Sequence, residues 1–390
     1  MFSCIIHSAT LISGGEQHDN AWVAFSGDRI IATGSGDAWR EETESSASIT
    51  DAAGGLLVPG FIDIHCHGAD GASFDDAPEG TARAISAHRR HGTTRSVLSL
   101  ISDEHAQLVK RVAAIADLAQ ADPTIAGSHL EGPFLDHQFR GAHNADVLRA
   151  PTSQEIDELL AAARGTLLQV TLAPELPGGA EAIARFVAAG VRVAVGHTAA
   201  GYTETLTAFE AGASILTHAF NGMRELHHRA PGPVGAALHS SSATLEVIND
   251  GVHVHPDVVA MLFASAPGRV ALVTDAMAAT CVGDGQYVLG SLAVTVEDGV
   301  ARLNDSGAIA GSTLTMDGAV RRAVLEMGIR LPQAIAAATE VPARAIGRAD
   351  VWGSLEPGFA ADAVLLDSDL RVLAVWAAGH ELPRPEHPVF

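Results

Sequence analysis

Eight short apolar runs alternate with longer amphipathic stretches through the middle of the chain, and this alternation constrains the fold most strongly. The runs are rich in Val, Ile, Leu and Thr, and they cover residues 56–65, 93–100, 124–131, 167–175, 191–197, 213–218, 243–250 and 269–275. Buried parallel strands read as continuous apolar runs, and intervening helices provide the crossovers that parallel pairing needs. Eight such units predict an α/β fold, a (β/α)8 TIM-like barrel of about 250 residues.

The two ends of the chain show a different pattern. Residues 1–55 and 353–390 contain short β-rich runs separated by turn residues, without helical periodicity. We expect both segments to meet in one small β-sandwich domain, which leaves residues 56–352 as a metal-dependent catalytic barrel domain. Residues 287–307 have the pattern of a β-hairpin inserted after the last barrel strand.

Composition argues against several classes of partner. The chain carries 24 basic and 46 acidic residues, a formal net charge of -22. A nucleic-acid surface needs basic stripes, so no nucleic acid is expected, and an anionic substrate would need locally placed Arg or His. No run approaches the ~20 apolar residues of a membrane span, and the first residues lack a secretory pattern. We therefore expect a cytoplasmic protein without membrane contact.

The segment GFIDIHCHG, residues 60–68, ends the first apolar run with two histidines. Side chains two apart in a strand point to the same side, so His65 and His67 face the same way. Taken alone, this short pattern fits a metal site or an ordinary polar strand end.

Other residues of the metal-ligand type fall at the carboxyl ends of the predicted strands, where barrel enzymes build their active sites. The set comprises His65, His67, Glu131, His197, His218 and Asp275. Imidazole and carboxylate ligands suit Zn²⁺, or alternatively Fe²⁺, and an open position on such an ion makes bound water acidic. We predict that Asp275 is the general base that takes a proton from this water and returns it to the leaving group.

Each of these residues also has a structural alternative. Glu131 could be an acid at a helix N-terminus, Asp275 could be a helix N-cap, and the histidines could be hydrogen-bonded core residues. Their joint placement at one end of the barrel favours the metal site. For His129, two residues before Glu131, we expect a supporting or packing role.

Motifs spread from about residue 56 to 360 resemble one known family. They read PGFIDIHCHG, HLEGPF, GHT, THAFNGM, DGVH, VTDAM, AGSTLTM and PARAIG. Together they are similar to the N-acetylglucosamine-6-phosphate deacetylases of the amidohydrolase superfamily. The resemblance implies metal-dependent hydrolysis of N-acetylglucosamine 6-phosphate to glucosamine 6-phosphate and acetate.

The resemblance also implies a ligand set. Glu131, His197 and His218 correspond to the main metal ligands of the family. His65 and His67 correspond to a second-metal pair, so one or two ions per subunit are expected, with Glu131 bridging two. Many amidohydrolases bridge two metals with a carboxylated lysine instead, but the single lysine of this chain, Lys110, lies in a predicted helix.

The substrate contacts are likewise implied by the resemblance. His143 is similar to a histidine that polarises the acetamide carbonyl, and His253 to one that contacts the sugar. Asn221 and Gly222 lie in a loop that holds the phosphate. Arg229 resembles an arginine that reaches the phosphate in the neighbouring subunit, which implies a homodimer. Without the resemblance, His143 and His253 would be interpreted as surface histidines and Arg229 as part of a solvated turn.

Two departures from the family pattern bear on substrate choice. The family usually has Ala where this chain has Gly222, and Arg-Glu-Pro-Gly where this chain has RAPG, residues 229–232. Two other hypotheses therefore stand beside the first. One is a deacetylase of a related sugar phosphate, such as N-acetylgalactosamine 6-phosphate, and the other is a non-catalytic structural protein with the same barrel.

Overall fold

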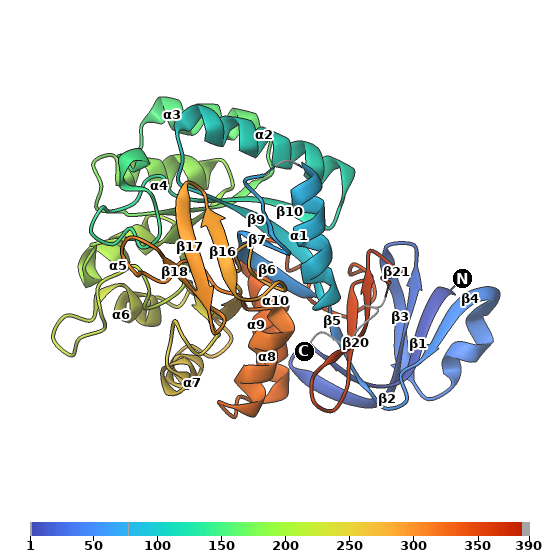
Figure 1. The fold of residues 1–390 in the computed structure, drawn as a ribbon. Coiled ribbons are helices and arrows are strands. Elements are labelled where there is room, and N and C mark those ends of the chain that lie inside the picture. The colour runs from blue at the N-terminus through green and yellow to red at the C-terminus, as the bar shows by residue number, and fades with distance from the viewer. Residues whose placement is uncertain (1, 77, 384–390) are drawn as a thin grey trace.

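The chain forms a large α/β part and a smaller β-rich part, which lie side by side in Figure 1. The computed structural model describes residues 2–76 and 78–383, so residues 384–390 of the expected C-terminal segment lie outside the described residues. The division into domains at 1–55 with 353–390 and at 56–352 stays a prediction.

The large part is built around one sheet of 8 parallel strands. In sheet order these are β6 (Phe61–Cys66), β9 (Thr93–Ile101), β10 (Ile125–Glu131), β11 (Leu167–Leu172), β12 (Arg192–Val195), β13 (Ile215–Leu216), β14 (Thr244–Ile248) and β15 (Val270–Val273). Their order in the sheet is their order in the chain, as expected when each strand is followed by a right-handed crossover. The predicted (β/α)8 barrel is confirmed.

Helices cover the outside of this sheet. They are α1 (Pro78–Arg90), α2 (His105–Ala121), α3 (Ser153–Ala163), α4 (Gly179–Ala188), α5 (Tyr202–Glu210), α6 (Gly232–His239), α7 (Pro256–Ser265), α8 (Met316–Leu325), α9 (Leu331–Ala338) and α10 (Glu340–Ala345). Local signals set their ends. At α3, for example, the Thr152 side chain accepts a hydrogen bond from the backbone N–H of Glu155, an N-cap interaction.

The barrel closes where the last strand, β15, returns beside the first, β6. The backbone N–H of Asp275 donates to the carbonyl of His65 at 2.8 Å. The Thr274 hydroxyl donates to the buried Asp63 carboxylate at 2.5 Å. Closure therefore brings the residues after the last strand directly against the two histidines that end the first.

The small part is a sheet of 8 strands to which both ends of the chain contribute. Its strands are β1 (Phe2–Ser13), β2 (Glu16–Ser26), β3 (Arg29–Ser35), β4 (Thr43–Asp51), β5 (Leu56–Pro59), β19 (Ala363–Leu366), β20 (Val372–Ala377) and β21 (His380–Glu381). The two ends meet where β5 pairs with β1 on one side and β19 on the other. The separate β-rich unit built from both termini is therefore present.

The apolar run 56–65, expected as one barrel strand, is divided between the two parts. Leu56–Pro59 pairs in the small sheet, and Phe61–Cys66 is the first barrel strand. Pro59 has no N–H to continue a ladder. A Cβ on Gly60 would lie 2.1 Å from Thr94 Oγ1, so only glycine allows the chain to pass from one sheet to the other here.

The insertion after β15 contains one strand more than the expected hairpin. Its strands β16 (Gly285–Leu289), β17 (Leu292–Glu297) and β18 (Val300–Leu303) form a separate antiparallel sheet. Between β17 and β18, Asp298 and Gly299 have φ of 52° and 74°, which is the conformation of a type I′ hairpin turn. Leu289 of β16 reaches the pocket at the carboxyl ends of the barrel strands.

Candidate metal centre

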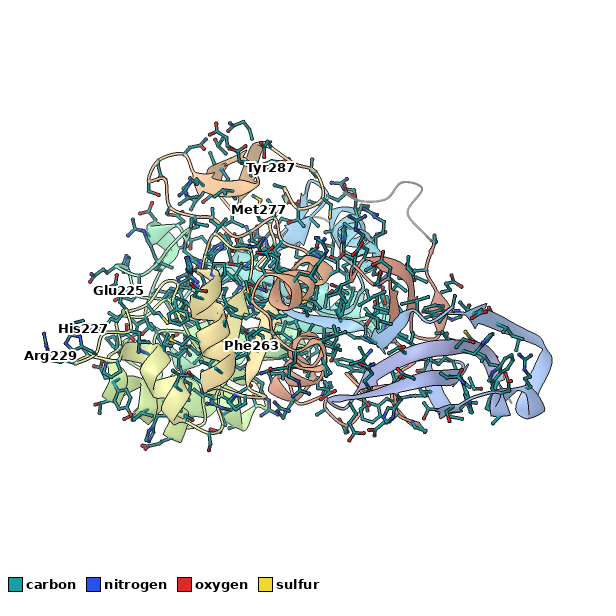
Figure 2. All side chains as sticks on the ribbon, turned by 90° about the horizontal axis from the view of Figure 1, so that it is seen from below. Glu225, His227, Arg229, Phe263, Met277 and Tyr287 are labelled. Carbon is teal, nitrogen blue, oxygen red and sulfur yellow. The ribbon has the colours of Figure 1, made fainter. Side chains whose placement is uncertain are left out.

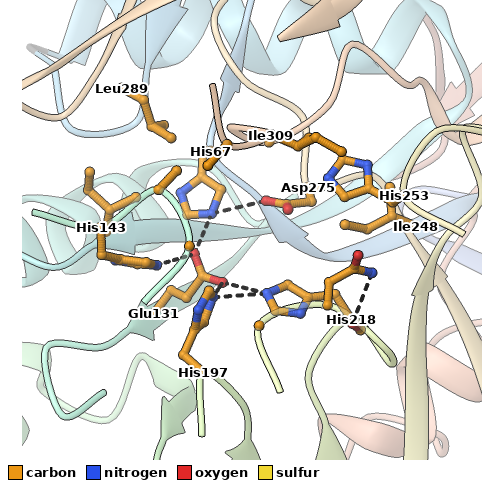
Figure 3. Close-up of a pocket in the computed structure, with 17 residues that line it drawn as sticks. His67, Glu131, His143, His197, His218, Ile248, His253, Asp275, Leu289 and Ile309 are labelled. Carbon is orange, nitrogen blue, oxygen red and sulfur yellow. Dashed lines mark hydrogen bonds and ion pairs between the residues drawn. The ribbon is translucent and has the colours of Figure 1, made fainter. Parts of the chain in front are cut away.

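A pocket of about 220 Å³ opens at the carboxyl ends of the barrel strands, and we call it the carboxyl-end pocket. Figure 3 shows its lining, with the side chains of His67, His143, His197, His218, Glu131 and Asp275 directed towards one another at its floor. Residues of this lining that the sequence singled out are His67, Glu131, His143, His197, His218, Asn221, Gly222, His253 and Asp275. His65, which is fully buried, lies directly beneath them.

Glu131, the last residue of β10, places its carboxylate at the centre of this floor. Its Oε1 lies 3.1 Å from Nε2 of His197 and 3.1 Å from Nε2 of His218. The same oxygen lies 3.2 Å from Nε2 of His65. Three imidazoles from three different strands therefore meet at one carboxylate oxygen.

The other oxygen of Glu131 faces a second group. Its Oε2 lies 3.1 Å from Nε2 of His67 and 3.4 Å from Nε2 of His143. Oδ1 of Asp275 lies 3.4 Å from Nε2 of His67 and 3.6 Å from Nε2 of His65. Because Glu131 belongs to both groups, its carboxylate is placed where it could bridge two ions.

Hydrogen bonds on the far side of two rings determine which ring nitrogen faces the centre. Nδ1–H of His197 donates to the Phe139 carbonyl at 2.9 Å, and Nδ1–H of His65 donates to Glu246 at 3.1 Å. In the neutral tautomer, each Nε2 then carries a lone pair and faces Glu131, which also offers only lone pairs. Lone pairs that face one another need a proton or a cation between them, and this set of imidazole and carboxylate ligands fits a divalent metal ion.

The two buried carboxylates also determine the charge of the histidines around them. Although burial opposes the charged form, hydrogen bonds with Asp275 and Glu131 raise the pKa of His67 to about 9. Burial likewise opposes charge at His65, but the nearby Glu131 charge raises the pKa of His65 well above its usual range. The cluster therefore attracts positive charge, which protons supply in the metal-free protein and which a divalent cation also carries.

His143 has a different electrostatic environment. Burial lowers the pKa of its imidazole to about 4. The backbone N–H of Ser102 donates to its Nδ1 at 3.4 Å, so Nε2 carries the proton and points towards Glu131. His143 is thus a neutral ring whose Nε2–H can donate to an oxygen of a bound molecule.

Three residues of the floor have backbones in the left-handed region. The φ angles are 47° at His197, 24° at His218 and 48° at Asp275. Such angles are uncommon for residues other than glycine, and they are typical of functional sites held by their surroundings. At each of these strand ends the chain turns sharply and directs its side chain into the site.

Glu246 is the main supporting residue that the sequence analysis missed. Its carboxylate is fully buried in β14, where it accepts from Nδ1 of His65 at 3.1 Å and from the backbone N–H of His218 at 3.3 Å. Gln169 Nε2 donates to its other oxygen at 2.7 Å. The signal was a lone acid inside the apolar run TLEVI, because a buried charge needs partners.

His129 and Lys110 lie outside the group of candidate ligands. Nδ1 of His129 is 2.9 Å from Ser99 Oγ and Nε2 is 2.9 Å from Thr171 Oγ1, so both ring nitrogens are occupied. Its ring packs edge-on against His65 at 4.7 Å, the supporting position expected for it. Lys110 is exposed on α2, so no lysine side chain reaches the site.

The loop after β13 approaches His197 closely. Gly222 has a φ of 58°, and a Cβ on it would lie 2.8 Å from His197 Nδ1. The departure from the family's usual Ala therefore has a steric reason in this conformation. Beside it, Asn221 Nδ2 donates to the carbonyls of His218 and Ala219 at 3.3 Å each.

His253 lies on the opposite wall of the pocket (Figure 3). Its Nδ1 is 2.7 Å from the Asp250 carboxylate, which also accepts from the backbone N–H of His253 at 2.9 Å. Against the penalty of burial, this carboxylate raises the pKa of His253. The ring is thus fixed with its other nitrogen available to the pocket.

Arg229 is the one predicted contact that does not line the pocket of its own chain. Figure 2 shows Arg229 and His227 at the tip of a loop that projects from the barrel. The exposed Arg229 side chain forms a hydrogen bond with its neighbour there, with Nη1 2.7 Å from His228 Nε2. In this conformation the guanidinium is therefore directed away from the carboxyl-end pocket.

Comparison with known proteins gives the same assignment as the site. The model of the amidohydrolase family matches residues 56–382, which includes every barrel strand. The chain belongs to the amidohydrolase family. The family is generally dependent on divalent metals, in agreement with the ligand cluster of this amidohydrolase.

Its relatives act on two different sugar phosphates. The chain is 41% identical to the N-acetylgalactosamine-6-phosphate deacetylase of Escherichia coli O157:H7, over 85% of this chain and 89% of that protein. It is 36% identical to the N-acetylglucosamine-6-phosphate deacetylase of Vibrio furnissii, over 83% and 82% of the two chains.

A solved structure extends the similarity to the whole fold. A mutant of the N-acetyl-D-glucosamine-6-phosphate deacetylase of Mycobacterium smegmatis, in complex with N-acetyl-D-glucosamine-6-phosphate, matches with a TM-score of 0.91. The identity is 40%, and the match covers 97% of this chain and 98% of that one. In this amidohydrolase, no helix of the described residues is long and apolar enough to cross a membrane.

Proposed function

We propose that this amidohydrolase hydrolyses the acetamide bond of N-acetylglucosamine 6-phosphate and releases glucosamine 6-phosphate and acetate. The observation that carries the proposal is the Glu131 carboxylate, buried at the pocket floor between two groups of imidazoles. The relatives with this activity at 36% and 40% identity support the same substrate class. We propose that the cytoplasm, predicted from the sequence, is the setting of the reaction.

We assign the metal to the residues that meet at Glu131. Glu131, His197 and His218 would hold one ion, and His65 with His67 would hold a second, with Glu131 shared between the two. Zn²⁺ is the proposed ion, with Fe²⁺ as the alternative. When bound, such an ion acidifies water and polarises a carbonyl.

The remaining steps belong to side chains of this protein. Asp275 accepts the proton of the attacking water and delivers it to the nitrogen as the C–N bond breaks, so the amine leaves neutral. His143 donates from Nε2–H to the carbonyl oxygen, on which negative charge develops. Asn221 and Gly222 contact the phosphate, and His253 contacts the sugar.

A second substrate has a specific observation in its favour. The relative at 41% identity, from Escherichia coli O157:H7, is an N-acetylgalactosamine-6-phosphate deacetylase. The two sugars differ only at one hydroxyl, so a hydrogen bond to that hydroxyl decides between them. A non-catalytic role is less well supported, because every ligand expected from the sequence lies at the pocket floor.

One experiment tests the proposed function. Acetate release is measured from N-acetylglucosamine 6-phosphate, N-acetylgalactosamine 6-phosphate and unphosphorylated N-acetylglucosamine, with elemental analysis of the same protein sample. We expect at least one divalent metal per chain and the highest kcat/KM on N-acetylglucosamine 6-phosphate. A higher kcat/KM on the galactose isomer would transfer the assignment to it, and a metal-loaded protein inactive on all three would refute the proposal.

The support from Glu246 can be tested separately from catalysis. Glu246→Leu removes the acceptor for Nδ1–H of His65 and for the His218 N–H, so metal affinity should fall about 10- to 100-fold. Glu246→Gln keeps an acceptor oxygen for His65 and is the matched control, with a smaller loss. Competition with a chelator measures both, and wild-type affinity in a folded Glu246→Leu protein would show that Glu246 does not position the ligands.

We propose that the protein is a homodimer in which Arg229 binds the substrate phosphate of the neighbouring subunit. Loss of this charge-assisted contact in Arg229→Ala should raise KM for the sugar phosphate about 10- to 100-fold. The unphosphorylated sugar should be unaffected. Arg371→Ala, which removes an exposed arginine just before β20, is the control. A monomer in sedimentation, or an unchanged KM, would contradict the proposal.

A further inference from the structure

A second pocket, of about 300 Å³, lies at the opposite end of the barrel, and we call it the amino-end pocket. Its lining residues are Arg192, Ser214, Ser241, Ser242, Thr244, Arg269, Arg344 and Ala345. Arg192 and Thr244 begin β12 and β14, while Ser214 and Arg269 immediately precede β13 and β15. The pocket is therefore formed at the amino ends of four consecutive strands, away from the metal centre.

The composition of this lining is unusual for a chain of net charge -22. It contains three arginines, four hydroxyl side chains and no acidic residue. Glu340 lies one turn before Arg344 on α10. Its carboxylate accepts a hydrogen bond from the backbone N–H of Gly14 at 2.8 Å, and its charge also interacts with Arg344. The three guanidinium groups around this pocket outnumber the one nearby carboxylate, and a bound anion would reduce the repulsion between them.

The three arginines of the lining differ in their hydrogen bonds. The guanidinium of Arg269 binds the backbone of its own chain, because Nη1 donates to the carbonyls of Ala237, Ser240 and Ala243 at 2.8 to 2.9 Å. Arg344 donates through Nη2 to Gly268 O, which leaves its other nitrogens available. Arg269 thus holds the wall after α6, while Arg344 retains donors for a ligand.

The guanidinium of Arg192 lies close to the backbone at Gly347. A Cβ on Gly347 would lie 2.5 Å from Nη2 of Arg192, so the side chain packs directly against the backbone that follows α10. Among the side chains that the structure describes, which exclude those of residues 1, 41–46, 77 and 384–390, Arg192 forms no salt bridge with a carboxylate. Arg192 is exposed at the pocket, and its planar guanidinium can bind an oxyanion through two N–H groups.

Ser214 provides an independent indication of a ligand. Its Oγ is shielded from bulk water and has no hydrogen-bond partner in the described part of the chain. Buried hydroxyls are normally hydrogen-bonded, so an orphaned one at a pocket wall indicates a missing acceptor or donor. A phosphate oxygen within the pocket would accept from this hydroxyl.

From these features we infer that the amino-end pocket binds a small oxyanion of the phosphate class, either inorganic phosphate or the phosphate group of a phosphomonoester. Arg192 and Arg344 supply the charge and the N–H donors. Ser214 supplies a hydroxyl donor beneath them, and the exposed Ser241 and Ser242 form the rim. The site is separate from the phosphate contacts proposed at Asn221 and Gly222.

Equilibrium dialysis at constant ionic strength tests the inference, with inorganic phosphate and glycerol 3-phosphate as the two probes. The metal-loaded wild type is compared with the double variant Arg192→Gln/Arg344→Gln. Phosphate bound at the carboxyl-end pocket is common to both, so the difference belongs to the amino-end pocket. We expect the double variant to bind at this site at least about tenfold more weakly, as the loss of two charge-assisted donors implies.

Arg330→Gln is the matched control, since Arg330 is an exposed arginine outside the lining of either pocket. If the double variant does not fold, Ser214→Ala removes only the orphaned hydroxyl and should weaken binding severalfold. Binding of inorganic phosphate alone assigns the pocket to the free ion, and equal binding of glycerol 3-phosphate assigns it to a phosphate ester. Identical isotherms for wild type and variants would overturn the inference.

Discussion

Replacing Asp275 with asparagine is expected to leave a folded protein with its full metal content and a turnover reduced at least about 10²-fold. The amide has nearly the shape of the carboxylate, but it cannot accept the proton of the attacking water. Asp275 contributes only one oxygen near the histidines, 3.4 Å from His67 Nε2, so most of the ligand set survives the change. Steady-state kinetics and elemental analysis on one preparation measure both effects.

Asp257→Asn is the control for this variant, because Asp257 is a solvent-exposed acid on α7. It should retain wild-type turnover and metal content. Near wild-type turnover in Asp275→Asn would refute the assignment of Asp275 as the base. A loss of metal in that variant would instead make Asp275 primarily a ligand.

Replacing Glu131 with glutamine should abolish both metal binding and activity. The amide carries no charge, and its NH₂ group would face an imidazole nitrogen wherever it is placed between the two groups of histidines. Removing an ion that stabilises the transition state by several kcal/mol corresponds to about 10³-fold or more in rate. Metal content after dialysis against a weak chelator and the rate of acetate release are the two measurements.

The two variants are informative as a pair. Asp275→Asn is expected to lower the turnover without changing the metal content. Glu131→Gln should lower both the rate of acetate release and the metal content. Glu297→Gln, on an exposed position of β17, controls for the loss of an acidic residue. Full metal occupancy in Glu131→Gln would place the ligands elsewhere and would remove the basis for the bridging role.

Much of the site could be predicted because each ligand follows an apolar run in a repeating pattern. Glu131, His197, His218 and Asp275 all close such runs, and parallel strands align their carboxyl ends at one rim. The direction of these side chains could not be predicted. It depends on left-handed backbones such as that of His197, with a φ of 47°, which are imposed by tertiary contacts.

The predictions missed features that depend on pairing between distant residues. Glu246 joins His65 to the backbone of His218, and nothing local in TLEVI indicates either partner. The run 56–65 was expected as one strand, because its apolar pattern is continuous across the point where Gly60 leads from one sheet to the other. The local sequence pattern indicates that a strand forms. Which sheet the strand joins depends on the strands that lie beside it in the folded protein.

The closure of the barrel between β15 and β6 has a consequence for how the protein is made. His65 and Asp275 are about two hundred positions apart in the chain, yet the N–H of Asp275 bonds to the carbonyl of His65. During synthesis, a ribosome-bound chain that ends before β15 lacks this contact. It also lacks Asp275 of the candidate metal centre. Contacts of such long sequence separation form late, because their loop must close first. Because Glu131, His197 and His218 all precede β15, time-resolved metal binding during refolding would show whether these candidate ligands assemble before the barrel closes.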